Sequence, residues 1–202
     1  REFTSDRNKK IDDIPFGGGP GMVIRPDIVE KAFMSIPQEE RQNLSKIYLT
    51  PSGKPLDQKQ LFNFSKNKGL IILCGRFEGI DSRVIDSLGF LKISLGDYVL
   101  TGGEVASQAL VEGCVRLLPG VLGDSDSVTE ESFSENLLEY PHYTKPQDWV
   151  DRNGISHKVP NILVSGHHQK IKEWRKKASI SVTKEYRPDL LKRNNGEYKE
   201  NE

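Results

Sequence analysis

Three short apolar runs, each followed by a glycine-containing loop, constrain the fold more than any other feature of this 202-residue chain. Their length and their content of β-branched and aromatic residues predict strands. The runs span 47–49, 70–74 and 91–100, the last broken by Gly96. The loops that close them span 50–53, 75–79 and 101–103.

Helical patterns fill the intervals between these runs and predict helices at 27–43, 57–66, 80–87 and 104–117. Strands that alternate with helices predict an α/β fold, with a parallel sheet covered by helices on both faces. In such sheets ligands bind at the carboxyl ends of the strands. We therefore expect the three glycine loops to converge on one site, where glycine lets backbone amides approach a ligand closely.

The composition changes near residue 123 and divides the chain. Residues 123–134 are polar and acidic without apolar periodicity, which predicts a linker. Beyond it, a helix is expected from about 167 to 178, and residues 167–193 contain nine Lys or Arg against three acids. We expect a first domain at 1–122, a linker at 123–134 and a small, basic, helical domain at 135–202, whose end at 194–202 is frayed.

Several classes of protein are disfavoured. Lys plus Arg equals Asp plus Glu at 29 each, so any nucleic-acid signal must be local. The two cysteines and four histidines lack metal-ligand spacing, so no metal site is expected. The chain has no phosphate-binding loop, and the run Gly17–Gly21 lacks the spacing of a dinucleotide fingerprint.

The apolar content of the chain and its first residues bear on cellular location and on whether a segment is missing upstream. No stretch approaches the roughly 18 to 20 apolar residues of a membrane span, and residues 1–10 are polar rather than signal-like. No membrane association and a cytoplasmic location are the expectations. Residues 1–4 resemble the end of a strand entering a loop, so we expect that a first strand is missing upstream.

Residues 94–104, SLGDYVLTGGE, are the most informative motif. They place a glycine, expected to form a bulge, inside a strand and a glycine pair at the turn into a helix. The glycine run 17–21 is flanked by Asp12-Asp13 and Arg25-Pro26, which would give that loop polar groups for a substrate.

A series of motifs in fixed order then resembles the bacterial tRNA (guanine-N1)-methyltransferases over nearly the whole chain. The motifs lie at 12–22, 74–81, 94–104, 119–123, 140–146 and 164–168. The resemblance implies a SPOUT-class fold with a deep trefoil knot, which is an exception to the rule that chains are unknotted. The family also has a further amino-terminal strand and helix.

The family binds S-adenosylmethionine in a bent shape with three loops of the knot. Carried over by position, the cofactor-binding residues here are Tyr48, Leu49, Thr50, Pro51, Gly53, Gly75, Glu78, Leu95, Gly96, Asp97, Tyr98, Val99, Leu100, Gly102 and Gly103. The Glu78 carboxylate suits a cofactor that carries positive charge. The resemblance also allows for a magnesium ion.

The implied reaction is methyl transfer to N1 of guanosine at position 37 of tRNA, just 3′ of the anticodon. The proton on N1 needs a general base, and the charge that builds on O6 needs a cation. By position, Arg116 is the cation. The family has an aspartate before Ser-Phe in the linker where this chain has Glu131, so Glu131 is the expected base and Glu130 the fallback.

The resemblance implies a homodimer and contact with the tRNA anticodon arm. The expected tRNA-binding residues are Asp12, Arg116, Trp174, Arg175 and Lys176. Two alternatives stay open at this point. One is another SPOUT methyltransferase that modifies a ribose 2′-hydroxyl, which would need no base for a ring nitrogen. The other is a non-catalytic RNA-binding protein that has kept the fold.

Overall fold

The computed structural model describes residues 1–121, 131–133 and 135–193. The chain divides into two compact units, Arg1–Gly123 and Asp124–Glu202. Within the described ranges, no helix combines the length and the apolar character needed to cross a membrane.

The first unit is built on a three-stranded parallel sheet in the order β4-β3-β5. The strands are β3 (Ser45–Pro55), β4 (Leu70–Cys74) and β5 (Leu91–Ser94). Strand β4 has the bounds that its apolar run predicts. Because β3 lies in the middle, its residues 47–49 pair with both neighbours.

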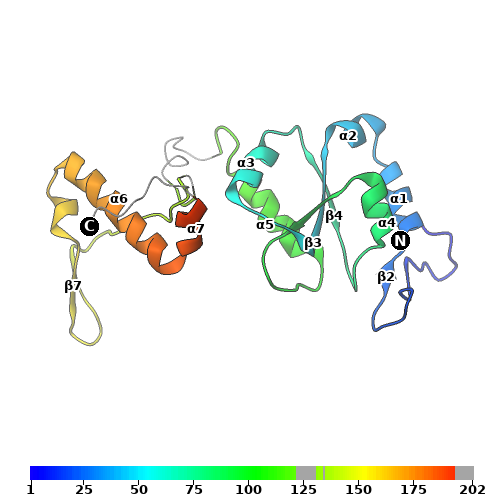
Figure 1. Cartoon of the computed structure of the whole chain (residues 1–202), viewed down its shortest axis with the longest axis horizontal. Coiled ribbons are helices and arrows are strands. Elements are labelled where there is room, and N and C mark those ends of the chain that lie inside the picture. Colours follow the sequence, from blue (N-terminus) through cyan, green and yellow to red (C-terminus); the bar gives the residue numbers. More distant parts are fainter. Residues whose placement is uncertain (122–130, 134, 194–202) are drawn as a thin grey trace. The chain divides into compact units, whose positions relative to one another are not determined.

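Helices cover both faces of this sheet, as predicted (Figure 1). Helices α1 (Pro26–Met34) and α4 (Ser82–Leu88) pack on the face that carries Tyr48, and α3 (Gln58–Ser65) and α5 (Gly103–Val115) pack on the face that carries Ile47 and Leu49. Successive strand residues point to opposite faces, so β3 contributes to both apolar clusters. The expected α/β fold is confirmed.

The prediction of one continuous helix at 27–43 was wrong, because this stretch forms two helices. Helix α1 ends at Met34, and α2 (Gln38–Asn43) begins after Pro37. Proline disfavours helical conformation in the residue before it, here Ile36, and so separates the two. Two other helices shift by a few residues, since α4 begins after the Asp81 cap and α5 ends at Val115.

Two strand ends also differ from expectation. Strand β5 ends at Ser94 rather than continuing to residue 100, because the Ser94 hydroxyl donates to Gly96 O at 3.0 Å and accepts from Gly96 N at 3.2 Å. Gly96 therefore lies in a turn beyond the strand. Conversely, β3 does not end before residue 50, since it bulges between Leu49 and Lys54 and pairs with β5 again up to Pro55.

Residues 1–25 form a separate small substructure. Residues 1–4 lie in a turn, so the expectation that they end a strand was wrong. Strands β1 (Asp12–Asp13) and β2 (Val23–Ile24) pair antiparallel and close the glycine-rich loop between them.

The second unit contains a hairpin as well as helices. Its elements are β6 (Asp148–Val150), β7 (Ser156–Lys158), the 3₁₀ turn η2 (Asn161–Val164), α6 (His168–Tyr186) and α7 (Pro188–Arg193). Helix α6 is longer than the predicted 167–178. Most of the predicted linker and the predicted frayed tail fall outside the described residues.

Candidate functional site

The bulge of β3 and the loops that follow β4 and β5 surround a cavity of about 220 Å³. Every residue expected to bind the cofactor lines it except Gly53 and Asp97. The predicted set therefore comes together from three segments of the chain. Arg76, Phe77, Gly79 and Thr101 also line it, and they belong to the loops that were expected to converge but were not named as cofactor-binding residues. Ile93, Ser94 and Ala106 line the cavity as well and were not predicted as part of these loops.

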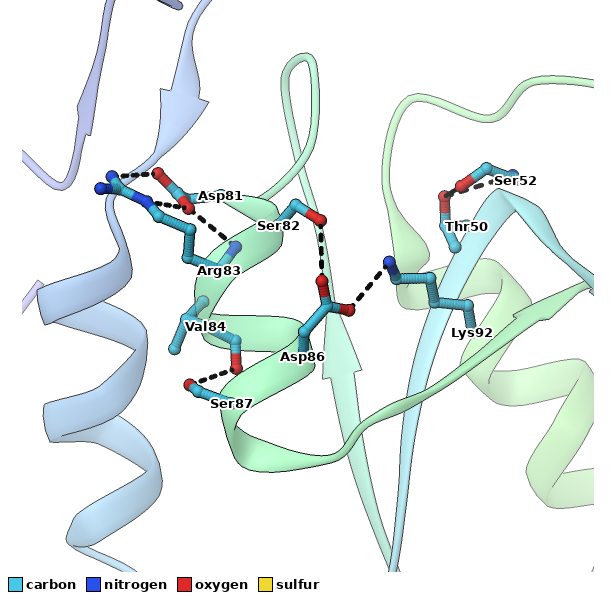
Figure 2. Close-up of polar contacts among 9 residues, drawn as sticks. All are labelled: Thr50, Ser52, Asp81, Ser82, Arg83, Val84, Asp86, Ser87 and Lys92. Carbon is cyan, nitrogen blue, oxygen red and sulfur yellow. Dashed lines mark hydrogen bonds and ion pairs between the residues drawn. The ribbon is translucent and has the colours of Figure 1, made fainter.

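The first wall of the cavity is the β3 bulge. The hydroxyls of Thr50 and Ser52 lie 3.1 Å apart and hold the turn of the bulge (Figure 2). Gly53 does not line the cavity, but a Cβ there would overlap the backbone of Ile93 in β5. Its role is to let the bulged strand return against its neighbour.

The second wall is the loop after β4, which is fastened to the start of α5. Gly103 N donates to Gly75 O at 2.9 Å, and the Arg76 guanidinium pairs with the Glu104 carboxylate at 2.8 Å. A Cβ on Gly103 would lie 2.8 Å from Cys74 Cα, so only glycine allows this approach. The glycine pair thus brings the end of β4 and the start of α5 together.

Two ionisable side chains in this wall are perturbed. The pKa of Glu104 is lowered by its own backbone amide and, next, by the Arg76 guanidinium. Burial raises the pKa of the Tyr48 hydroxyl, whose ring lies beside Gly75 and Gly79. The cavity therefore combines a buried phenol that stays neutral with an ionised pair at its edge.

Phe77 is held in an unusual conformation at the cavity. Its φ of +59° lies in the left-handed region, which non-glycine residues rarely adopt. Its side chain is nevertheless exposed. Strained residues of this kind gather at ligand sites, although nothing in the residue types around Phe77 indicates its conformation.

The third wall is the loop that follows β5. Beyond the Ser94 turn, Tyr98 N donates to Gly96 O at 2.9 Å, which compacts the loop. Tyr98, Val99 and Leu100 line the cavity, whereas Asp97 does not. Because β5 ends at Ser94, the residues that follow it form a loop that lines the cavity instead of continuing the strand.

The glycine-rich loop is joined to the second wall through β2. Glu78 N donates to Met22 O at 2.9 Å, Ile24 N donates to Gly79 O at 2.9 Å, and the Glu78 side chain lies against Gly21. Asp12 is half-buried and pairs with Ile24. The loop expected to meet the substrate is therefore anchored to a cavity wall.

Helix α4 fixes the far side of this wall. The Asp81 carboxylate accepts from Arg83 N at 2.9 Å and caps the helix, and the Arg83 side chain lowers the pKa of Asp81 (Figure 2). Asp86 contacts Lys92 of β5 at 3.2 Å. The Asp81 contacts are local to the start of α4, whereas the Asp86–Lys92 contact ties the helix to the sheet.

The predicted catalytic residues lie in different units. Arg116 caps the carboxyl end of α5 in the first unit, where it is half-buried, and it does not line the cavity. Glu131 belongs to the second unit and is also half-buried. Glu130 falls outside the described residues.

The predicted RNA-binding residues of α6 have partners within the second unit. The Trp174 ring is half-buried, with its centroid 6.3 Å from that of Tyr143. The Arg175 guanidinium lies 4.8 Å from the Tyr140 ring centroid, and Lys176 pairs with Glu135 at 3.3 Å. Trp174 is thus partly covered rather than presented as a free flat surface.

Among the side chains that the structure describes, no group of three or more His, Cys, Asp or Glu residues could hold a metal ion.

Comparison with known proteins gives consistent matches. The family model described as tRNA (guanine-1)-methyltransferase TrmD matches residues 1–193. Three relatives are each named tRNA (guanine-N(1)-)-methyltransferase. The protein from Rhodospirillum rubrum is 50% identical over 194 residues, covering 96% of this chain and 77% of its own length. Those from Ruegeria pomeroyi and Clostridioides difficile are 47% and 48% identical over 96% of this chain and over 77% and 83% of their own lengths.

Proposed function

This chain belongs to the tRNA (guanine-1)-methyltransferase family, and from that premise we propose that it methylates N1 of guanosine at position 37 of tRNA, just 3′ of the anticodon. The family's reaction is S-adenosylmethionine-dependent methylation of guanine N1 in tRNA. The observation that carries the proposal is the convergence of three segments, the β3 bulge and the loops after β4 and β5, on one cavity.

The residues of the cavity fit S-adenosylmethionine. Backbone groups of the first and third walls can hydrogen-bond the adenine edge in this proposal, and Gly103, which lines the cavity, adds no side chain to it. The Glu78 carboxylate suits a ligand with positive charge. When bound, the cofactor supplies a methyl group activated by its sulfonium.

Glu131 and Arg116 supply the chemistry at the guanine in this proposal. The Glu131 carboxylate accepts the proton from N1, and the electron pair of the broken N–H bond would form the new bond to the methyl group while the bond from sulfur to that methyl breaks and its electrons stay on sulfur as a neutral thioether. Arg116 stabilises the negative charge that develops on O6. Magnesium, which proteins usually hold with one or two carboxylates plus substrate oxygens, stays an expected helper ion.

The tRNA partner is supported by two surfaces. Helix α6 offers Arg175 and Lys176 to phosphates, which attract cations without reading sequence. The glycine-rich loop, which carries Asp12 at its base, presents Phe16 with 99% of its surface exposed, and exposed aromatic rings suit stacking on unpaired bases. A tRNA substrate also supports our proposal of a cytoplasmic location.

We further propose the SPOUT knot and a homodimer. The knot rests on membership of the family. The dimer is supported by exposed apolar residues at the end of α5 and just beyond it, Val111, Val115 and Leu118, with Val99 exposed before the helix begins. Light scattering of wild type and Val115→Glu tests the dimer, because a charge in a buried interface would reduce the measured mass to that of one chain.

The decisive test of the function is methyl transfer from labelled S-adenosylmethionine to unmodified tRNA transcripts with guanosine or adenosine at position 37. We expect label only in the first transcript, recovered as 1-methylguanosine after digestion. Equal labelling of both transcripts would reject the target. Label recovered on a ribose 2′-oxygen would favour the other methyltransferase reaction, and absence of cofactor binding would favour a non-catalytic RNA-binding protein.

A further inference from the structure

The segment that contains Glu131 is folded back on itself. We call residues 131–133 and 135–139 the Glu131 segment. Phe133 N donates to Leu137 O at 2.7 Å, and Glu139 N donates to the Ser132 hydroxyl at 3.0 Å. The residue next to Glu131 is therefore held from the opposite end of the segment.

Thr183 of α6 fixes this fold in place. Its hydroxyl accepts from Leu138 N at 2.8 Å and donates to Ser179 O at 2.7 Å. Its side chain is completely buried, at 0% exposure, and Leu137 beside the contact is buried as well. Because the hydroxyl proton is committed to Ser179, the oxygen lone pair is oriented toward Leu138.

Two further contacts join the Glu131 segment to α6 and its end. The Arg187 guanidinium lies 6.0 Å from the Phe133 ring centroid and is itself oriented by Asp189 at 2.8 and 2.9 Å. Lys176 pairs with Glu135 at 3.3 Å. The segment therefore contacts both halves of α6.

We propose that Thr183 is a positioning residue for the methyl transfer, which acts through Leu138, Glu139 and Ser132 on Glu131. Adjacent Cα atoms are about 3.8 Å apart, so fixing Ser132 confines the backbone of Glu131 closely. The inference rests on the proposed function of Glu131 as the base. As a consequence, the segment that contains the proposed base is attached to α6, the helix that we propose binds RNA phosphates. Displacement of α6 would therefore also displace Glu131.

A double-mutant cycle between Thr183 and Glu131 tests the proposal. Thr183→Val keeps the shape but removes the hydroxyl, and we expect single-turnover methyl transfer to fall by about 10- to 100-fold, the scale of a small misplacement of a catalytic group. The affinities for S-adenosylmethionine and tRNA should stay within about twofold of wild type. In a Glu131→Gln background, the same change should add less than about threefold, because a residue that acts through Glu131 has nothing left to position.

Thr183→Ser is the matched control, since it keeps the hydroxyl and should stay within about threefold of wild type. Thermal unfolding checks that each variant is folded. If Thr183→Val does not fold, Ser132→Ala replaces it in the cycle, and faster amide exchange at Glu139 reports directly that the contact is lost.

Three results would overturn the inference: independent effects of the two changes, a wild-type rate in Thr183→Val, or a loss in Thr183→Ser equal to that in Thr183→Val. Failure of the proposed function has a different signature. It would appear as an inactive wild-type protein, whereas a fully active Glu131→Gln variant would remove the base on which the inference rests.

Discussion

The cofactor cavity and the Glu131 segment are held by different kinds of contact. The cavity depends on backbones that meet where only glycine fits, as at Gly53 and Gly103. The Glu131 segment depends on two hydroxyls, those of Ser132 and Thr183, that accept from backbone amides. The contrast teaches that the two sites proposed for methyl-donor binding and for proton removal depend on separable residues, so variants in each region should change different measured quantities.

Glu131→Gln should have the largest effect on turnover, and it would sharpen the contrast between the cofactor cavity and the Glu131 segment. Loss of the base should lower turnover by roughly 10²- to 10⁴-fold, the usual contribution of general base catalysis. Cofactor affinity, measured by titration calorimetry, should not change. Glu185→Gln, on the exposed surface of α6, is the control and should behave like wild type. Wild-type turnover in Glu131→Gln would remove Glu131 from the mechanism.

Arg116→Ala asks whether the first unit also contributes to chemistry without contributing to cofactor binding. Removing the cation that we propose stabilises charge on O6 should lower turnover by about 10²- to 10³-fold, with cofactor affinity unchanged. Arg116→Lys should recover part of the rate because it keeps the charge. A rise in the cofactor dissociation constant with little change in turnover would instead assign Arg116 to donor binding.

Gly103→Ala tests the cavity side of the comparison. The new Cβ would lie 2.8 Å from Cys74 Cα and force α5 away from β4. Overpacking costs about 1–3 kcal/mol, so the cofactor dissociation constant should rise by about tenfold or more while turnover at saturating cofactor changes little. Gly69→Ala is the control, because its new Cβ would meet only the flexible Leu44 side chain at 3.2 Å. An unchanged cofactor dissociation constant in Gly103→Ala would contradict the claim that the cavity depends on the close backbone approach at Gly103.

The smallest expected effect is acid sensitivity at the edge of the cavity. The folded-state pKa of Glu104 is lowered, so its contribution to stability is present above the unfolded-state pKa and is lost as pH falls through the lowered value. Urea unfolding between pH 7 and pH 3 should therefore show a slightly shallower loss of stability in Glu104→Gln than in wild type. The effect is small because solvent screens this exposed pair. A steeper loss of unfolding free energy at low pH in Glu104→Gln than in wild type would contradict a lowered pKa for Glu104.

Local sequence patterns predicted most of the first unit. Strand β4 has the expected bounds, and the helix expected at 57–66 is α3, which Asp57 caps by accepting from Gln60 N at 2.8 Å. The end of β5 was missed because the Ser94 hydroxyl satisfies the Gly96 backbone locally, which apolar periodicity does not reveal. The β3 bulge was missed because it depends on pairing with β5, which is distant in sequence.

The candidate site was only partly predictable for the same reason. Each glycine loop was visible because it follows an apolar run. The Arg76–Glu104 pair joins residues 28 positions apart, and the contact of Leu138 with Thr183 spans 45 positions. Such pairings follow from tertiary packing, so the sequence offered Arg76 only as a member of a glycine loop, and Thr183 lay beyond the helix predicted at 167–178.

Amide hydrogen exchange with and without S-adenosylmethionine tests most directly whether the three strand ends form the donor site. We expect slower exchange on cofactor addition in three separate segments, 48–53, 75–79 and 95–103, with no change in the Glu131 segment in the absence of tRNA. Protection confined to other segments, or no protection at saturating cofactor, would contradict the assignment of this cavity to the methyl donor.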